Sequence, residues 1–251
     1  MAMERFLGII PARYGSSRFP GKPLADIKGK TMIQHVYERA LGSAYLSDLV
    51  VATDDQRIMD VVEEFGGKAV MTSETHKSGT DRCREVLEKL EEKGNQYSVV
   101  INIQGDEPYI DPRQIDEVAE MFTKVGIQIA TLARKIDKED DLFNTNVNKV
   151  VFGRDEKAIY FSRHPIPFQQ NVDRKVWLSN YTYYKHIGIY AYRSQTLQKI
   201  TQLERSKLEI AESLEQLRWI ENGYKIRVLL TDYESNAVDT PEDLSKFLNI
   251  S

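Results

Sequence analysis

The sequence predicts an α/β fold built on a mostly parallel, Rossmann-like sheet that carries a smaller lobe. Over the first two-thirds of the chain, short apolar runs alternate with segments of helical periodicity, as parallel βαβ units require. After about residue 140 this rhythm changes, and a polar and aromatic segment with two prolines, 163–184, separates two further strand patterns. We therefore expect one domain, 1–251, whose smaller lobe covers about 155–222.

Apolar runs and apolar spacing predict the individual elements. Strands are expected at 6–10, 49–53, 69–72, 99–104, 127–133, 147–152, 187–192 and 226–231. Helices are expected around Ile33 to Leu41, Ile58 to Phe65, Val86 to Leu90, Ile115 to Phe122 and Lys207 to Asn222. Thr31 and Gln34 form a capping-box pattern, Gly66 and Gly223 mark helix ends, and Thr240-Pro241 predicts the start of a last helix.

Composition limits the classes of partner. The chain has 251 residues, 34 Lys and Arg, 38 Asp and Glu, and a formal net charge of -4, so nothing attracts nucleic acid or anionic lipid along its whole length. The one cysteine, Cys83, excludes an internal disulfide and is interpreted as a buried structural residue. An 18-residue apolar run and a signal-peptide pattern at Met1–Gly8 are both missing from the sequence. We expect a cytoplasmic protein that binds neither membranes nor nucleic acid.

The segment that follows the first strand, 11–23, concentrates positive charge. It holds Arg13, Arg18 and Lys22, together with two glycines and the hydroxyl of Ser16. Ligands of open α/β sheets bind where the strands end, and cations near glycines suit a triphosphate. A solvated basic loop is the alternative. The P-loop pattern fails because Leu24 stands where its first glycine belongs, and a Gly-x-Gly-x-x-Gly turn is missing too.

A carboxylate follows the apolar run 99–104 directly. Asp106 stands after Gly105, where a sheet of this type binds ligands, and Mg²⁺ prefers carboxylate and phosphate oxygens. Asp106 is therefore the predicted first metal ligand, although a turn or helix cap before Pro108 explains it as well. Asp239, just before the last predicted helix, would be the second ligand if the fold brings it near.

The chain resembles the family of 3-deoxy-manno-octulosonate cytidylyltransferases, which make CMP-Kdo (CMP-3-deoxy-D-manno-octulosonate) for bacterial lipopolysaccharide. The matching segments occur in the family's order and span nearly the whole chain: 10–24, 76–82, 100–108, 160–163, 186–190, 214–218 and 238–244. The first is shared with other sugar nucleotidyltransferases, and the second, fifth and sixth narrow the resemblance to this family. The family usually has Leu where Phe19 stands, and 168–185 matches no family residues.

The resemblance implies the reaction CTP + Kdo → CMP-Kdo + pyrophosphate with Mg²⁺, on a nucleotidyltransferase sheet whose smaller lobe binds the acceptor and forms a homodimer. It implies triphosphate contacts from Arg13, Ser16 and Lys22, nucleotide contacts from Ser78, Gly79 and Arg82, Gln104 close to the reacting centre, metal at Asp106 and Asp239, and sugar-acid contacts from Arg163, His186 and Tyr190. Glu212 and Gln216, on one face of the predicted helix 207–222, are expected to bind sugar hydroxyls.

Simpler interpretations of the acceptor residues remain open. Arg163 suits a bidentate clamp on the Kdo carboxylate but also fits a surface arginine, and His186 fits a structural histidine. Glu209, Glu212 and Gln216 also fit a solvated helix face. Two alternative functions remain. One is another sugar-acid or polyol nucleotidyltransferase, such as one that activates sialic acid, and the other is a non-catalytic nucleotide-binding module. A glycosyltransferase fits less well because Gly105-Asp106-Glu107 is not an Asp-x-Asp motif.

Overall fold

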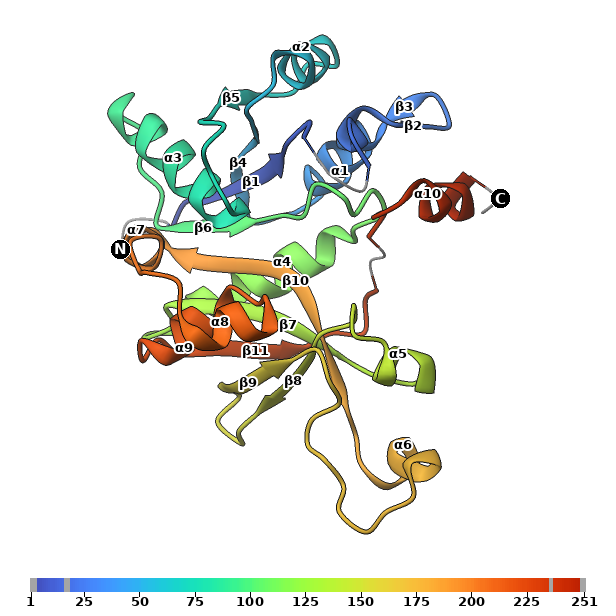
Figure 1. Ribbon diagram of the computed structural model, residues 1–251. Coiled ribbons are helices and arrows are strands. Elements are labelled where there is room, and N and C mark those ends of the chain that lie inside the picture. Colours follow the sequence, from blue (N-terminus) through green and yellow to red (C-terminus); the bar gives the residue numbers. More distant parts are fainter. Residues whose placement is uncertain (1–3, 16–18, 235–236, 249–251) are drawn as a thin grey trace.

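One mixed β-sheet organises the part of the chain that this computed structural model describes, residues 4–15, 19–234 and 237–248. Its strands follow the order β11-β7-β10-β6-β1-β4-β5, and the hairpin of β8 and β9 attaches to β10 (Figure 1). The strands are β1 (Phe6–Ala12), β4 (Leu46–Thr53), β5 (Ala69–Met71), β6 (Val99–Asn102), β7 (Ile129–Lys135), β8 (Lys149–Phe152), β9 (Ala158–Ser162), β10 (Tyr184–Arg193) and β11 (Ile226–Leu230).

Along the main strand order, four of the six neighbouring pairs run parallel. Strands β5, β4, β1 and β6 form a parallel block. The next strand, β10, is antiparallel to both β6 and β7, and β11 is parallel to β7. The loops after β1, β4, β5 and β6 therefore meet at one edge, where sheets of this type bind ligands. The mostly parallel α/β fold predicted from the sequence is confirmed.

Helices cover both faces of the sheet. Alternate residues of β1 point to opposite faces, with Phe6 and Ile10 in one hydrophobic cluster and Leu7 and Ile9 in another. The first cluster lies under α1 (Met32–Ala40), α2 (Gln56–Glu64) and α4 (Pro112–Glu120), and the second under α3 (Gly79–Glu92), α7 (Ser194–Ile200) and α9 (Gln216–Glu221). A strand buried on both faces explains the near-continuous apolar run of β1.

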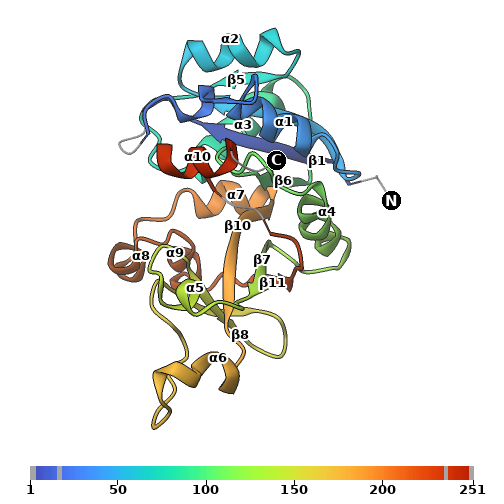
Figure 2. The same ribbon diagram turned by 90° about the vertical axis from the view of Figure 1, so that its right-hand side faces the viewer.

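The segment between β9 and β10 extends away from the parallel block, as Figures 1 and 2 both show. It contains η3 (Arg174–Val176) and α6 (Trp177–Asn180), so the loop-rich insertion predicted here holds short helices. Trp177 and Tyr183 pack with Ile136 and with Leu142 of α5 (Glu139–Phe143). Strand β9 was not among the predicted strands.

The predicted helix 207–222 is wrong in one respect that matters for the site. Two helices, α8 (Lys207–Glu212) and α9, replace it, and Ser213 between them is left-handed with φ 53°. Arg218 of α9 donates to both carboxylate oxygens of Glu209 in α8, each at 2.9 Å. This buried pair ties the two helices together, which a periodicity argument along one helix does not capture.

The two predicted helix starts differ in outcome. The Thr31 capping box is wrong, since Thr31 Oγ1 has no hydrogen-bond partner among the described residues and the Gln34 amide donates to Glu38. At the last helix, α10 (Pro241–Leu248), the Asp243 amide donates to Thr240 Oγ1 at 3.2 Å, as predicted. The remaining elements are η1 (Lys22–Leu24), β2 (Asp26–Ile27), β3 (Lys30–Thr31) and η2 (Met121–Thr123). Every helix in the described ranges is too short or too polar to cross a membrane.

Candidate active site

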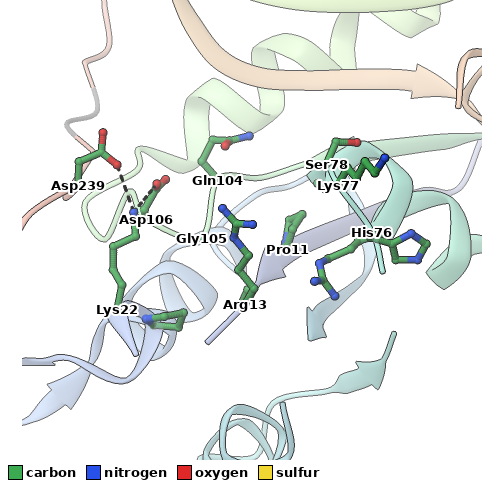
Figure 3. A pocket seen from close by; sticks show the side chains of 14 residues that line it. Pro11, Arg13, Lys22, His76, Lys77, Ser78, Gln104, Gly105, Asp106 and Asp239 are labelled. Atoms are coloured by element: carbon green, nitrogen blue, oxygen red, sulfur yellow. Dashed lines mark hydrogen bonds and ion pairs between the residues drawn. The ribbon is translucent and has the colours of Figure 1, made fainter. Parts of the chain in front are cut away.

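A cavity of about 270 Å³ opens at the carboxyl edge of the parallel strands. In Figure 3, Lys22, Asp106 and Asp239 gather on one side and His76, Lys77 and Ser78 on the other, and Arg13 and Gln104 lie between the two groups. The residues that line it are Pro11, Ala12, Arg13, Lys22, Pro23, His76, Lys77, Ser78, Gly79, Arg82, Gln104, Gly105, Asp106 and Asp239. Four of these side chains, from Arg13, Lys22, Lys77 and Arg82, carry a fixed positive charge, which suits a polyanion.

The two predicted metal-binding carboxylates lie together around one cation. Lys22 Nζ is 2.8 Å from Asp106 Oδ2 and 3.4 Å from Asp239 Oδ1. The Val238 amide donates to the Asp106 carbonyl at 2.8 Å, and the buried Val238 side chain packs against Ile27. This anchor holds the segment before α10 against the loop after β6. Asp239 thus lies near Asp106, as its proposed role as second ligand requires, and metal binding by the pair stays a prediction.

Gly105 allows the loop after β6 to approach the end of β1. A Cβ atom on this residue would lie 2.6 Å from the Pro11 carbonyl oxygen, closer than real Cβ contacts. Any side chain here would therefore push the two loops apart. The glycine keeps Asp106 and Arg13 on the same cavity.

The opposite wall is the start of α3. Ser78 caps this helix and its hydroxyl accepts from the Asp81 amide at 3.2 Å. Arg82 is buried, donates to Thr72 Oγ1 at 2.7 Å and pairs with Asp54 after β4. The predicted nucleotide residues Ser78, Gly79 and Arg82 all line the cavity, and Arg82 also ties the loops after β4 and β5 together.

His76 and Lys77 line the same wall and were not singled out from the sequence. The imidazole of His76 is hydrogen-bonded to Glu85 of α3. Burial alone would raise the pKa of Glu85, but hydrogen bonds from Lys89, the Ser73 amide and His76 outweigh burial and lower that pKa to about 2. Glu85 therefore remains ionised and fixes His76 beside the cavity.

A second cavity of about 220 Å³ adjoins the first, and the two share Gln104, Gly105, Pro11 and Gly79. It is also lined by Thr80, Asn102, Gly188, Tyr190, Tyr192, Glu215, Gln216 and Trp219. Asn102 Oδ1 and Trp219 Nε1 are buried polar atoms without a hydrogen-bond partner in the described part of the chain. Unpaired buried polar atoms are costly, so this lining suits a ligand that carries hydroxyl groups.

The break between α8 and α9 decides which side chains reach the second cavity. Gln216, an expected sugar ligand, lines it, together with Glu215, which was not singled out from the sequence. Glu215 accepts from Thr80 Oγ1 at 2.7 Å, and burial raises the pKa of its carboxyl group. Glu212 lies in α8 and instead accepts from Ser162 Oγ at 2.8 Å and from the Arg163 amide at 2.9 Å. Glu212, expected to bind the sugar, is therefore not among the residues that line the second cavity, because it belongs to α8, and Glu215 lines the cavity instead.

Arg163 also occupies a different position from the one expected. Its guanidinium donates to the backbone carbonyls of Glu212 at 2.6 Å, Thr145 at 3.1 Å and Ser213 at 3.2 Å. It is not among the residues that line either of the two cavities. In this geometry Arg163 joins the end of β9 to the end of α8, and a clamp on a sugar carboxylate is not supported.

Tyr190 lines the second cavity, whereas His186 lies behind it. The His186 ring stacks obliquely on Tyr190, with centroids 5.1 Å apart, and its Nε2 is 3.0 Å from Thr131 Oγ1. Burial lowers the pKa of His186 to about 3, so the ring is neutral near pH 7. Here His186 acts as a structural histidine, the simpler of its two interpretations. Two further residues of the basic segment, Ser16 and Arg18, lie outside the described residues.

Comparisons with known proteins identify the family. The family model described as "Cytidylyltransferase" matches residues 7–226. The 3-deoxy-manno-octulosonate cytidylyltransferase of Parabacteroides distasonis is 54% identical over 250 residues, 98% of each chain. The chain belongs to the 3-deoxy-manno-octulosonate cytidylyltransferase family. The enzyme of the same name from Bacteroides thetaiotaomicron is 55% identical over 243 residues, covering 96% of this chain and 95% of its own.

A solved structure agrees with this assignment to the 3-deoxy-manno-octulosonate cytidylyltransferases. It is described as CMP:2-keto-3-deoxy-manno-octonic acid synthetase complexed with CTP, is 45% identical, and superposes with a TM-score of 0.88 over 97% of this chain and 96% of its own. The resemblance inferred from the motifs is therefore confirmed, and this chain is a nucleotidyltransferase.

Proposed function

We propose that this 3-deoxy-manno-octulosonate cytidylyltransferase transfers CMP from CTP to the anomeric oxygen of Kdo and releases pyrophosphate. The observation that carries the proposal is the pair of adjoining polar cavities that meet at Gln104. One is lined by four cations and suits a nucleoside triphosphate, and the other is lined by hydroxyl, amide and carboxylate groups and suits a sugar acid. Formation of CMP-Kdo for lipopolysaccharide in the cytoplasm is part of this proposal.

Asp106 and Asp239 fit a divalent metal site. Both carboxylates already converge on one cation, the Lys22 ammonium, so their oxygens face a common point. The described residues contain no group of three or more His, Cys, Asp or Glu side chains that could hold a metal. Two carboxylates supplemented by substrate phosphates and water are what Mg²⁺ commonly uses. Bound there, Mg²⁺ would neutralise phosphate charge.

The positive side chains account for the nucleotide half of the reaction. The Kdo oxygen forms a bond to the α-phosphorus of CTP while the bond to the pyrophosphate oxygen breaks, so negative charge builds up on the leaving group. Arg13 and Lys22 line the cavity where that charge develops, and Lys77 adds a third cation. Fixed cations that stabilise a leaving group more than the ground state lower the barrier.

The acceptor half depends on the second cavity. Tyr190 keeps its hydroxyl proton, because burial raises the pKa of this phenol well above its ordinary value. Tyr190 and Gln216 can therefore donate hydrogen bonds, and Glu215 can accept them from sugar hydroxyls. Gln104 lies at the boundary and is placed to touch the attacking end of the acceptor.

The smaller lobe carries exposed apolar side chains that suit a homodimer interface. Phe168 is 74% exposed, Val176 46% and Tyr181 43%, and all three belong to the segment between β9 and β10. A homodimer through this face predicts that Phe168→Glu lowers the molar mass measured by light scattering after gel filtration. Val125→Glu, at an exposed apolar residue outside the segment between β9 and β10, is the control and should leave the mass unchanged.

Pyrophosphate release from CTP and Mg²⁺, measured with and without Kdo, tests the proposed reaction. Release that requires Kdo supports it. Release with sialic acid but not with Kdo would show that the acceptor is another sugar acid. CTP binding without release with either acceptor would favour a nucleotide-binding module without catalysis.

A further inference from the structure

Strand β10 carries a bulge beside Gln104. Its register against β7 runs regularly to Ile187 opposite Leu132 and resumes at Tyr190 opposite Thr131. Gly188 and Ile189 are therefore extra residues of a β-bulge. Strand β6, the neighbour on the other side, ends at Asn102 opposite Tyr190. The bulge thus stands next to the loop that holds Gln104, and bulges often re-aim groups at functional sites.

The buried side chain of Thr131 fills this bulge. Its hydroxyl oxygen lies 2.7 Å from the Ile189 carbonyl, 3.2 Å from the Ile187 carbonyl and 3.0 Å from His186 Nε2. One hydroxyl can donate to a carbonyl and accept from the imidazole at the same time. Thr131 therefore holds the Ile189 carbonyl toward β7, and the Ile187 carbonyl lies toward the same hydroxyl at the longer distance.

With its neighbours held on one side, the Gly188 carbonyl faces the other side and accepts from Gln104 Nε2 at 2.9 Å. The opposite amide orientation would set two acceptor oxygens against each other, so this bond fixes the orientation of the Gln104 amide. A Cβ atom on Gly188 would already lie in contact with Gln104 Cγ at 3.4 Å, so the added methyl groups of a valine would press on the Gln104 side chain. The Gln104 oxygen and its second N–H remain available to a ligand.

We propose that Thr131 and Gly188 are positioning residues for the transfer reaction and that they act through Gln104. Gln104 is shared by the nucleotide cavity and the acceptor cavity, so its orientation decides how the two reactants meet. The inference rests on the proposed function, because it assigns Gln104 to the place where the acceptor approaches CTP.

Three variants test this proposal. Thr131→Val keeps the shape but removes the hydroxyl, and it should lower kcat about tenfold with the KM for CTP unchanged. Thr131→Ser keeps the hydroxyl and should retain near-normal kcat. Gly188→Val, which displaces Gln104 sterically, should lower kcat in the same way as Thr131→Val. A purely structural Thr131 would instead lower the melting temperature of the valine variant and leave kcat unchanged, which would overturn the proposal.

A double-mutant cycle with Gln104→Ala decides whether Thr131 acts through Gln104. In that background, Thr131→Val should cost less than twofold in kcat. A further tenfold loss would show that Thr131 acts independently of Gln104 and would also overturn the proposal.

A spectroscopic measurement tests the positioning of Gln104 independently of whether the protein catalyses the proposed reaction. The side-chain amide signal of Gln104, identified by its loss in Gln104→Met, should shift in Thr131→Val but not in Thr131→Ser in ¹H–¹⁵N spectra. An unshifted signal in Thr131→Val contradicts the proposal, whatever the activity. Failure of the wild-type protein to release pyrophosphate with Kdo contradicts the proposed function alone.

Discussion

Lys22 Nζ lies 2.8 Å from Asp106 Oδ2 and also contacts Asp239, so a lysine ammonium occupies the point on which the two carboxylates converge. A divalent metal bound by this pair would compete with that ammonium for the same oxygens. In the presence of nucleotide, Lys22 would move from the carboxylates toward the phosphates. The same side chain would then balance two negative groups at different stages of substrate loading.

The first prediction concerns Lys22→Met, which keeps the length of the side chain but removes its charge. Without nucleotide this variant should bind Mn²⁺ more tightly than the wild type, about tenfold by titration calorimetry, because the competing ammonium is gone. Its kcat should nevertheless fall, since the leaving group loses a cation. Lys30→Met, at an exposed lysine paired with Glu38, is the control. Equal Mn²⁺ affinity in Lys22→Met and wild type would contradict the competition.

The second prediction concerns the carboxylates. Asp106→Asn and Asp239→Asn should each lower kcat at least about 100-fold while the protein remains folded, because each removes a charged oxygen ligand. Circular dichroism confirms folding, and kcat is measured over a Mg²⁺ titration. Near-normal activity of either variant at low Mg²⁺ would mean that its carboxylate does not hold the metal.

The third prediction separates two glutamates that lie close in sequence. Glu215→Gln should raise the KM for Kdo about tenfold, because Glu215 lines the acceptor cavity and an amide replaces one acceptor oxygen with a donor. Glu212→Gln should leave that KM nearly unchanged and lower the melting temperature instead, since Glu212 bonds Ser162 and Arg163. The opposite pattern would restore Glu212 as the sugar ligand.

The fourth prediction concerns Arg163→Lys. The guanidinium donates to three backbone carbonyls, and an ammonium cannot span them. Unfolding free energy should therefore fall by about 1–2 kcal/mol in urea denaturation, while kcat/KM for Kdo at saturating CTP changes less than threefold. A loss of 30-fold or more in Kdo use with normal stability would show that Arg163 binds the sugar carboxylate after all.

The fifth prediction concerns pH. The pKa of His186 is lowered by burial to about 3 in the folded protein, against 6.5 ordinarily. Between pH 6.5 and pH 3 the unfolded chain binds a proton that the folded chain does not, so stability falls as the pH drops, by at most about 1.4 kcal/mol per pH unit. His186→Asn should show a shallower decline in urea denaturation, and His164→Asn, at an exposed histidine, should match the wild type. Parallel curves for all three proteins would refute the assignment.

The sequence predicts most of the parallel half of the molecule and the cation-lined cavity, because both depend on local signals. Apolar runs mark β1, β4 and β6, and the positive charge of the segment after β1 can be read from its lysine and arginine residues. Long-range contacts explain the failures. The buried Glu209–Arg218 pair and the left-handed Ser213 divide the predicted helix, which turns Glu212 away from the cavity and brings Glu215 to it.

The predictions that failed for the acceptor cavity failed for the same reason, since long-range contacts decide which side chains reach it. The motif 214–218 contains Glu215, so the signal that could have found it was present, but the assumption of one continuous helix selected the wrong face. The apolar pattern of 187–192 does not predict the bulge in β10. The bulge depends on the hydrogen bond of the Thr131 side chain, in β7, to the Ile189 carbonyl. Asp239 is placed by contacts between distant parts of the chain, among them the bond between Val238 and Asp106, which no local sequence pattern reveals.

The contact between Lys22 and Asp239 joins residues 217 positions apart in the chain. A ribosome adding 5–20 residues per second makes the second of them roughly ten to forty seconds after the first. Once Asp106 has also been made, 84 residues after Lys22, the nascent chain contains the cation-rich segment but only one of the two carboxylates until Asp239 follows. If catalysis requires both carboxylates, as predicted above, activity would begin only after the segment around Val238 has docked, and its onset would report that nearly all of these 251 residues have been made and folded.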